Sequence, residues 1–245
     1  ASRGRGDVYK RQLSNRELLS NAEEAGRQNL SVVKDPDTRN KLTPSMAFGC
    51  RRPLASNLYY PVFNRPNVQL INQGVDRMSR DTVHAGNEST VVDTVIFATG
   101  FQTTRYLSCV DVYGRNGLSI HDAWRDGAQA YLGITTANFP NLFMLYGPNT
   151  NNGSILEMIE HQVAYVLRQI RFMDENTLQW MALKPSKMAR YNDDLQRDLK
   201  NVDVWHGDCG GYYRGRGGFI VTQWPHTMDE YKSRLHSDSD SFDVG

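Results

Sequence analysis

The feature that most constrains the fold is an apolar run that ends in small residues. Residues 91–98 read VVDTVIFA, and Thr99 and Gly100 follow directly. An apolar run of this kind predicts a strand covered on both faces, as in a parallel α/β sheet. Small residues at the carboxyl end of such a strand let a ligand approach the backbone. Ala98, Thr99 and Gly100 are therefore candidate ligand contacts, although a plain strand-to-loop turn would read the same way.

Helical periodicity marks three other segments. Residues 13–28 carry leucines and alanines on one side, and residues 185–200 begin with a proline at a favoured first position. Ser154 opens a sequence that fits a capping box. Apolar runs at 67–71 and 141–146 are strand-like. The helix after Ser154 has an apolar stripe that predicts core packing, made of Ile155, Ile159, Val163, Val166 and Ile170.

Two loops carry groups that suit an anion. Residues 41–53 read KLTPSMAFGCRRP, an irregular and positively charged stretch that contains Arg51 and Arg52. A solvated pair is the usual fate of adjacent arginines, but loops of such specific character often carry function. The second loop, GPNTN at 147–151, comes just before the helix that follows Ser154. The free amides and positive dipole end of a helix start favour an anion, although an ordinary surface helix would have the same start.

Composition excludes several classes of function. Lysine and arginine total 28 against 27 aspartate and glutamate, so the formal charge of +1 predicts no binding to nucleic acid or to an anionic membrane. No apolar run approaches the roughly 20 residues of a membrane helix. Cys50, Cys109 and Cys209 are far apart and odd in number, which argues against a disulfide framework and favours the cytoplasm. The six histidines lack paired spacing, so we expect no metal site.

The two ends of the chain are set aside from the fold. Residues 1–12, ASRGRGDVYKRQ, resemble translated cloning adaptor, and residues 236–245 are predicted to be a disordered tail. Between them, no G-x-G-x-x-G stands after a strand and before a helix. The chain therefore lacks the fingerprint with which dinucleotide-binding folds hold a pyrophosphate.

Four blocks of the sequence, taken in order, resemble class B flavoprotein monooxygenases, and most of all the Baeyer–Villiger type. Residues 49–71 read GCRRPLASNLYYPVFNRPNVQLI, and residues 91–101 read VVDTVIFATGF. Residues 122–166 begin DAWRDGAQAYLG and contain FPNLF, GPNT and the pattern E-x-Q-x-x-Y-V. Residues 209–231 read CGGYYRGRGGFIVTQWPHTMDEY. The resemblance covers about residues 41–231.

This resemblance implies an α/β fold with two dinucleotide-binding domains, like that of glutathione reductase. Residues 13–97 would complete an NADPH-binding domain, and residues 98–235 would form the later part of an FAD-binding domain with an extension. The amino-terminal FAD-binding Rossmann half, which holds the glycine fingerprints in this family, would be missing. The implied cofactors are FAD and NADPH. The implied reaction inserts one oxygen of O₂ beside a ketone carbonyl through a C4a-peroxyflavin.

The resemblance also assigns roles to particular residues. Arg52 matches the arginine that faces the flavin and stabilises negatively charged intermediates, and is the candidate catalytic residue. Arg51 matches the position that holds the 2′-phosphate of NADPH. Tyr212 replaces a tryptophan that contacts the nicotinamide nucleotide, which puts that contact in doubt. The remaining candidate cofactor-binding residues are Ala98, Thr99, Gly100, Gly147, Pro148, Asn149, Thr150 and Ser154.

Two alternatives stay open at the level of sequence. A flavin monooxygenase that oxygenates nitrogen or sulfur shares the ATG segment, so the small-molecule substrate could carry a heteroatom in place of a ketone. The chain could also be an inactive truncated fragment or a non-catalytic binding module. Under that interpretation its main partner would be the missing amino-terminal half of the same protein.

Overall fold

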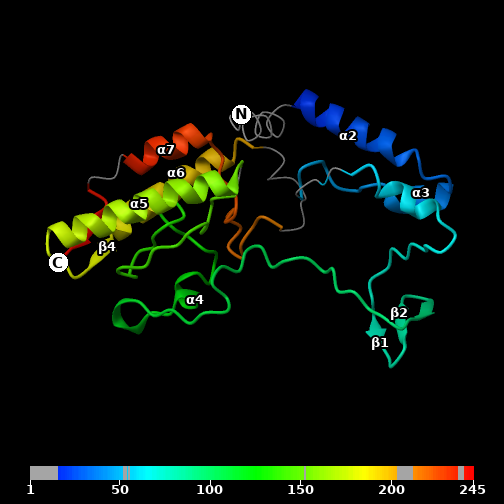
Figure 1. The fold of residues 1–245 in the computed structure, drawn as a ribbon, viewed down its shortest axis with the longest axis horizontal. Helices are drawn as coiled ribbons and strands as arrows, with labels where there is room; N and C mark the ends of the chain where they lie inside the picture. Colours follow the sequence, from blue (N-terminus) through cyan, green and yellow to red (C-terminus); the bar gives the residue numbers. More distant parts are fainter. Residues whose placement is uncertain (1–15, 52–53, 55, 152, 203–211, 237–239) are drawn as a thin grey trace. The chain divides into compact units, whose positions relative to one another are not determined.

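The computed structural model describes residues 16–51, 54, 56–151, 153–202, 212–236 and 240–245. The described residues divide into two compact units. The larger unit draws on the described residues within 16–19, 46–51 and 102–245, and the smaller unit on those within 20–45 and 54–101. Figure 1 colours their elements along the chain.

The larger unit consists of helices with a small antiparallel strand pair. Strands β4 (Met181–Leu183) and β5 (Phe242–Val244) pair so that Leu183 faces Phe242. A short 3₁₀ turn, η2 (Arg115–Gly117), stands before the first helix of this unit. The helices of the unit are α4 (Ile120–Ala123), α5 (Ile155–Glu175), α6 (Pro185–Leu199) and α7 (Met228–His236) (Figure 1).

One hydrophobic core joins α5, α6 and α7 to the loops between them. Its side chains are almost fully removed from solvent, and burial of each large apolar side chain stabilises the fold by roughly 1.5–3 kcal/mol. Tyr165 of α5, Leu195 of α6 and Tyr231 of α7 meet in this core. Trp224, in the segment before α7, packs edge-on against Tyr231 with ring centroids 5.2 Å apart. The core therefore positions the loops that precede α5 and α7.

The smaller unit holds most of α2 (Arg16–Leu30) and a three-stranded antiparallel sheet in the order β1-β2-β3. Asp35 caps α3 (Pro36–Leu42), because its carboxylate accepts a hydrogen bond from the amide of Thr38 at 2.7 Å. Gly86 lies in the turn between β2 and β3 at φ +56°, a conformation that favours glycine. The other elements are η1 (Tyr60–Asn64), β1 (Arg77–Met78), β2 (Thr82–Ala85) and β3 (Glu88–Val91).

The three predicted helices are present. α2 begins at Arg16 and ends at Leu30, so it runs slightly beyond the predicted carboxyl end, and the first predicted residues lie outside the described ones. α6 begins at Pro185, as predicted. Ser154 caps α5, since its hydroxyl accepts a hydrogen bond from the amide of Glu157 at 3.3 Å.

The predicted strand at residues 91–98 is wrong for this structure. Only Val91 belongs to a strand, and Ile96 and Phe97 are 85% and 71% exposed, not buried on both faces. A strand needs neighbours that bond its edges and cover its faces, and the described part of the smaller unit offers none to this segment. The strand-like runs at 67–71 and 141–146 also form no strand. The disordered tail predicted at 236–245 is wrong in its last residues, because Phe242–Val244 form β5 and bond to β4.

The predicted core face of α5 is only partly correct: Val166 packs against the core, and Ile155 and Ile159 are half-buried. Val163 and Ile170 of the predicted stripe are 37% and 42% exposed. The face turned inward consists of Met158, Gln162, Tyr165 and Gln169. Hydrophobic periodicity places glutamine outside, but a glutamine with hydrogen-bond partners can lie in the core. Because two glutamines occupy the buried face, the sequence pattern pointed to the neighbouring face.

The cysteines also depart from expectation. Cys50 is disulfide-bonded, and its bonding partner lies outside the described residues. The sequence argued against a disulfide framework, because three separated cysteines do not reveal which pair the fold brings together. Cys109 is a free, exposed thiol.

In the described segments, no helix is both long and apolar enough to cross a bilayer.

Candidate functional site

The loop before α5 is the most tightly held candidate segment. Its four residues Gly147, Pro148, Asn149 and Thr150 are all buried. The Thr150 hydroxyl donates a hydrogen bond to the carbonyl of Gly147 at 2.6 Å, which closes the turn. A short polar loop buried in this way is fixed by its hydrogen bonds.

Asn149 ties this loop to the segment before α7. Its backbone takes the left-handed conformation, with φ 58°, which asparagine tolerates better than most residues. Its side-chain amide donates to the carbonyls of Ile220 at 2.7 Å and Gln223 at 3.0 Å. Its backbone amide donates to Val221 at 2.8 Å. Three bonds from one residue hold residues 147–151 beside residues 220–224.

Gly133 and Gly147 permit the loop at residues 132–133 to approach the loop before α5 closely. A Cβ at Gly133, which has φ +67°, would lie 2.1 Å from Cγ2 of Thr150. A Cβ at Gly147 would lie 2.4 Å from the carbonyl oxygen of Gly133. Neither position accepts a side chain without displacing backbone. The loop before α5 is therefore enclosed between residues 132–133 and 220–224.

Gln162 of α5 joins this loop to α7 through buried hydrogen bonds. Its Oε1 accepts from the backbone amide of Tyr146 at 2.7 Å, and its Nε2 donates to the hydroxyl of Tyr231 at 2.9 Å. The Tyr231 hydroxyl in turn donates to the carbonyl of Leu132 at 2.6 Å. Burial raises the pKa of Tyr231, while its bond to Gln162 acts in the opposite direction. The phenol thus stays protonated and keeps donating.

The amino-terminal end of α5 emerges next to this rigid loop. α5 is 21 residues long, so its macrodipole concentrates partial positive charge at the end near Ser154. Ser154 itself is exposed and caps only the amide of Glu157. The first-turn amides of a helix have no intrahelical acceptor, so those of Ile155 and Leu156 suit an anionic or electron-rich ligand.

Two further predicted site residues belong to the larger unit. Arg51 is exposed, and Tyr212 is half-buried. The carbonyl of Tyr212 accepts a hydrogen bond from Thr103 Oγ1 at 2.6 Å, and its ring stands edge-on to Tyr213 at 4.9 Å. Tyr212 therefore has a defined structural role in addition to the predicted one. Arg52, the predicted catalytic residue, lies outside the described residues.

Ala98, Thr99 and Gly100 belong to the smaller unit and are exposed. Gly100 has φ +84°, and a Cβ there would meet open space. The left-handed backbone agrees with the predicted turn of small residues. The structure thus assembles the predicted residues of the loop and helix start, 147–150 and 154, into one feature of the larger unit, whereas the ATG segment belongs to the smaller unit.

Sequence reasoning missed three residues that hold this site together: Gly133, Gln162 and Tyr231. Each lies within a block that carried the family resemblance, and that position was the available signal. Thr222 is a fourth residue of interest. Its buried Oγ1 has no hydrogen-bond partner among the described residues, while its carbonyl accepts the amide of Asn151 at 2.9 Å. An unpaired buried hydroxyl calls for a physical explanation, such as an unfilled binding site.

Comparison with known proteins identifies the family. No family model matches the chain. It is 40% identical over 198 residues to a Baeyer–Villiger monooxygenase of Pseudomonas aeruginosa, an alignment that spans 79% of this chain and 37% of that protein. This chain belongs to the Baeyer–Villiger monooxygenase family. A Baeyer–Villiger monooxygenase of Streptomyces coelicolor is 33% identical over 87% of this chain and 42% of its own length.

Solved structures agree with this family assignment. The structure of OTEMO in complex with FAD and NADP superimposes with a TM-score of 0.84 at 25% identity, over 96% of this chain and 46% of that one. A cyclohexanone monooxygenase mutant from Rhodococcus sp. Phi1 bound to NADP⁺ gives 0.80 at 25% identity, over 94% of this chain and 45% of that one. The chain thus spans less than half the length of the family members it matches.

Proposed function

We propose that this chain is the carboxy-terminal part of an FAD- and NADPH-dependent monooxygenase that inserts one oxygen of O₂ beside a ketone carbonyl. The observation that carries the proposal is the 40% identity to the Pseudomonas aeruginosa Baeyer–Villiger monooxygenase. The likeness to OTEMO, solved with FAD and NADP, supports the choice of cofactors. Substrate and activity belong to the whole protein, of which the chain spans a part.

The residues of the site fit a flavin. The loop 147–151 is buried and held by Asn149 and Gln162, so the end of α5 beside it has a fixed direction. A positive helix end of this kind favours a ring edge on which negative charge gathers during reduction. The unpaired Oγ1 of Thr222, on the segment that flanks the loop, offers a further polar group. We therefore assign residues 147–150 and Ser154 to the flavin side of the site.

The two arginines of the 41–53 loop would provide the positive charge that the reaction needs. FAD, when bound, supplies the activation of O₂, which amino-acid side chains cannot perform. Arg52 would stabilise negative charge that develops during oxygen insertion, an effect commonly worth about 3 kcal/mol of barrier. Arg51 would hold the 2′-phosphate of NADPH, a task suited to a guanidinium because it binds phosphate with two parallel hydrogen bonds.

Ala98, Thr99, Gly100 and Tyr212 complete the proposed cofactor contacts. The ATG segment would approach a cofactor through its backbone, since its small residues and the left-handed Gly100 leave the main chain open. Tyr212 would contact the nicotinamide nucleotide with a smaller ring than the tryptophan of the family pattern. The dinucleotide fingerprints absent from this sequence would come from the rest of the protein, the proposed amino-terminal half.

A single substitution tests the proposed role of Arg52. In the full-length protein, Arg52→Ala should reduce NADPH-dependent conversion of a ketone into an ester or lactone by about a hundredfold or more. Arg65→Ala provides the matched control, since Arg65 is an exposed arginine without a proposed role, and this variant should retain activity. Product analysis by gas chromatography measures the effect. Retained ketone oxidation in Arg52→Ala would reject the role of Arg52, and oxidation of sulfides but no ketone would favour the heteroatom-oxygenating alternative.

The chain by itself should be inactive. It carries no G-x-G-x-x-G fingerprint in a strand-to-helix context, and it spans 37% of the Pseudomonas aeruginosa relative. FAD would therefore lack the helix start that neutralises its pyrophosphate. The chain purified in the presence of FAD is expected to be colourless and to consume no oxygen with NADPH. A yellow protein with NADPH-dependent oxygen uptake would contradict this part of the proposal.

A further inference from the structure

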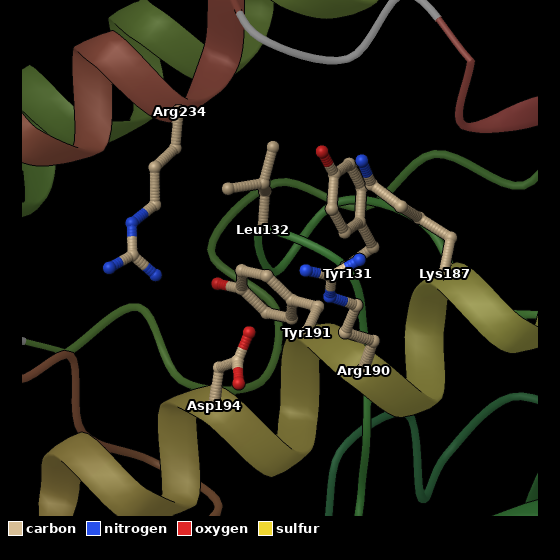
Figure 2. Close-up of a pocket in the computed structure, with 7 residues that line it drawn as sticks. All are labelled: Tyr131, Leu132, Lys187, Arg190, Tyr191, Asp194 and Arg234. Carbon is tan, nitrogen blue, oxygen red and sulfur yellow. The ribbon is translucent and has the colours of Figure 1, made fainter.

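A pocket of about 240 Å³ in the larger unit lies between α6, α7 and the loop at residues 131–132. Figure 2 shows its lining, in which α6 contributes most of the side chains and α7 contributes Arg234. None of the residues that line this pocket belongs to the proposed monooxygenase site. The lining residues are Tyr131, Leu132, Lys187, Arg190, Tyr191, Asp194 and Arg234.

Positive charge dominates this pocket. Lys187, Arg190 and Arg234 supply three cations, against the single carboxylate of Asp194. That carboxylate forms an ion pair on α6 with Arg197, which is outside the lining: its Oδ1 is 2.9 Å from Arg197 Nη2. In the described part of the chain, neither Lys187 nor Arg190 has a carboxylate within ion-pair distance. Asp240, whose charge interacts with that of Lys187, forms its ion pair with Lys184.

The spacing on α6 explains why these groups converge. Residues three, four and seven apart lie on one face of a helix, as do Lys187, Arg190, Tyr191 and Asp194. Cations clustered on one face repel each other unless an anion lies between them. The Lys187 ammonium is 5.6 Å from the centre of the Tyr131 ring, a cation–π distance that keeps it at the pocket wall.

Arg234 enters the pocket from α7 in a fixed orientation. Its Nε forms an ion pair with Glu230 at 2.9 Å, and its Nη2 lies 3.1 Å from His226 Nε2 and 3.7 Å from a carboxylate oxygen of Asp198. Its guanidinium lies 5.2 Å from the ring centre of Trp224. None of these contacts uses Nη1. A guanidinium held on one side and open on the other is prepared for an incoming acceptor.

Tyr191 supplies an independent indication of a ligand. The residue is only 8% exposed, and its hydroxyl is buried. Burial raises the pKa of this phenol, while the Leu132 backbone, which acts as a donor to the Tyr191 oxygen, lowers it; what has no acceptor among the described residues is the hydroxyl proton. In Figure 2 the Tyr191 hydroxyl points toward the side of the pocket where Arg234 and Asp194 stand. Leaving such a donor unpaired is costly, so a bound acceptor would satisfy it.

We propose that this pocket binds a phosphate or phosphomonoester dianion, with Lys187, Arg190 and Arg234 as its cations and the Tyr191 hydroxyl as a neutral donor. Arginine favours phosphate because its planar fork matches two oxygens at once. The volume is below the roughly 300 Å³ at which pockets for whole drug-sized ligands begin, which suits a single phosphoryl group with a small substituent. The apolar wall of Tyr131 and Leu132 would contact that substituent.

Thermal unfolding of the chain at constant ionic strength tests the proposal. Inorganic phosphate and ribose 5-phosphate serve as probes, and acetate is the anion control. We expect a saturable rise of the midpoint temperature with either phosphate and a larger rise with ribose 5-phosphate if the natural ligand is a phosphomonoester. An equal response to acetate and phosphate would overturn the proposal.

Variants separate binding from the general stabilisation that phosphate gives to folded proteins. Lys187→Gln and Arg190→Gln should each weaken the apparent phosphate affinity by at least about tenfold, as expected for loss of a charge-assisted hydrogen bond. Tyr191→Phe should also weaken the apparent phosphate affinity, although without phosphate this variant is expected to be as stable as the original protein. Lys200→Gln, at the end of the same helix and outside the lining, is the matched control and should bind normally. Unchanged affinity in the first two variants would refute the site.

Discussion

At the scale of single residues, the site depends on small and polar side chains that a hydrophobicity pattern does not reveal. Gly133, Gly147 and Asn149 let three stretches of backbone meet at distances that larger residues would prevent. Gln162 and Tyr231 complete the enclosure with buried hydrogen bonds. The candidate residues of the 147–150 loop could be named from the sequence through the family resemblance. Their supports could not, because buried polar partners are set by tertiary contacts.

Replacement of Gly133 should be far more damaging than replacement of a glycine with similar backbone but open space. Gly133→Ala forces a Cβ to 2.1 Å from Thr150 Cγ2 and should cost about 3 kcal/mol of unfolding free energy. Gly117, with φ +73° and nothing within 4 Å, is the control, and Gly117→Ala should cost about 1 kcal/mol for backbone strain alone. Urea unfolding measures both. Equal losses would show that the contact with Thr150 is not tight.

At the scale of elements, helices were more predictable than strands. α5 and α6 begin where capping and proline signals placed them, because those signals act within one turn of the helix. The strand predicted at 91–98 needs partners elsewhere in the protein, and its apolar side chains are exposed here. The inward face of α5 was only partly predicted because glutamines occupy it.

The cap of α5 should be measurable in the stability of the chain. Ser154→Ala removes the acceptor of the Glu157 amide and should lower the unfolding free energy by about 1 kcal/mol. Ser154→Asp keeps an acceptor at the same place and should restore most of the loss. Chemical denaturation of the three proteins provides the comparison. A loss of the same size in Ser154→Asp would mean that the hydroxyl does not act as a cap.

The contact between Asp240, before β5, and Lys184, after β4, should depend on pH. Its atoms are 2.5 Å apart, and the hydrogen bond from Lys184 lowers the pKa of Asp240. A carboxylate with a lowered folded pKa stabilises the fold above its unfolded pKa, and this stabilisation is lost as pH falls through the folded value. Asp240→Asn should therefore be slightly less stable than the parent near pH 7 and equal to it in strong acid. Thermal unfolding of both proteins from neutral pH to strong acid measures the difference in stability. A difference that does not change with pH would exclude the ion pair as its cause.

At the scale of the whole molecule, the family was predictable because its motifs occur in order over most of the chain. The division of the described residues into a larger and a smaller unit is a property of the structure. The assignment of residues 13–97 to an NADPH-binding domain and 98–235 to an FAD-binding domain stays a prediction. Arg52, the residue on which the proposed chemistry depends most, lies outside the described residues, so its role rests on sequence resemblance.

The most direct test of this account is the fate of oxygen in the full-length protein. The protein, loaded with FAD and supplied with NADPH, a cyclic ketone and isotopically labelled O₂, should form a lactone that carries one labelled oxygen atom in its ring. Mass spectrometry of the product reads this directly. A ketone recovered unchanged while NADPH is consumed, or a lactone without label, would contradict the assignment.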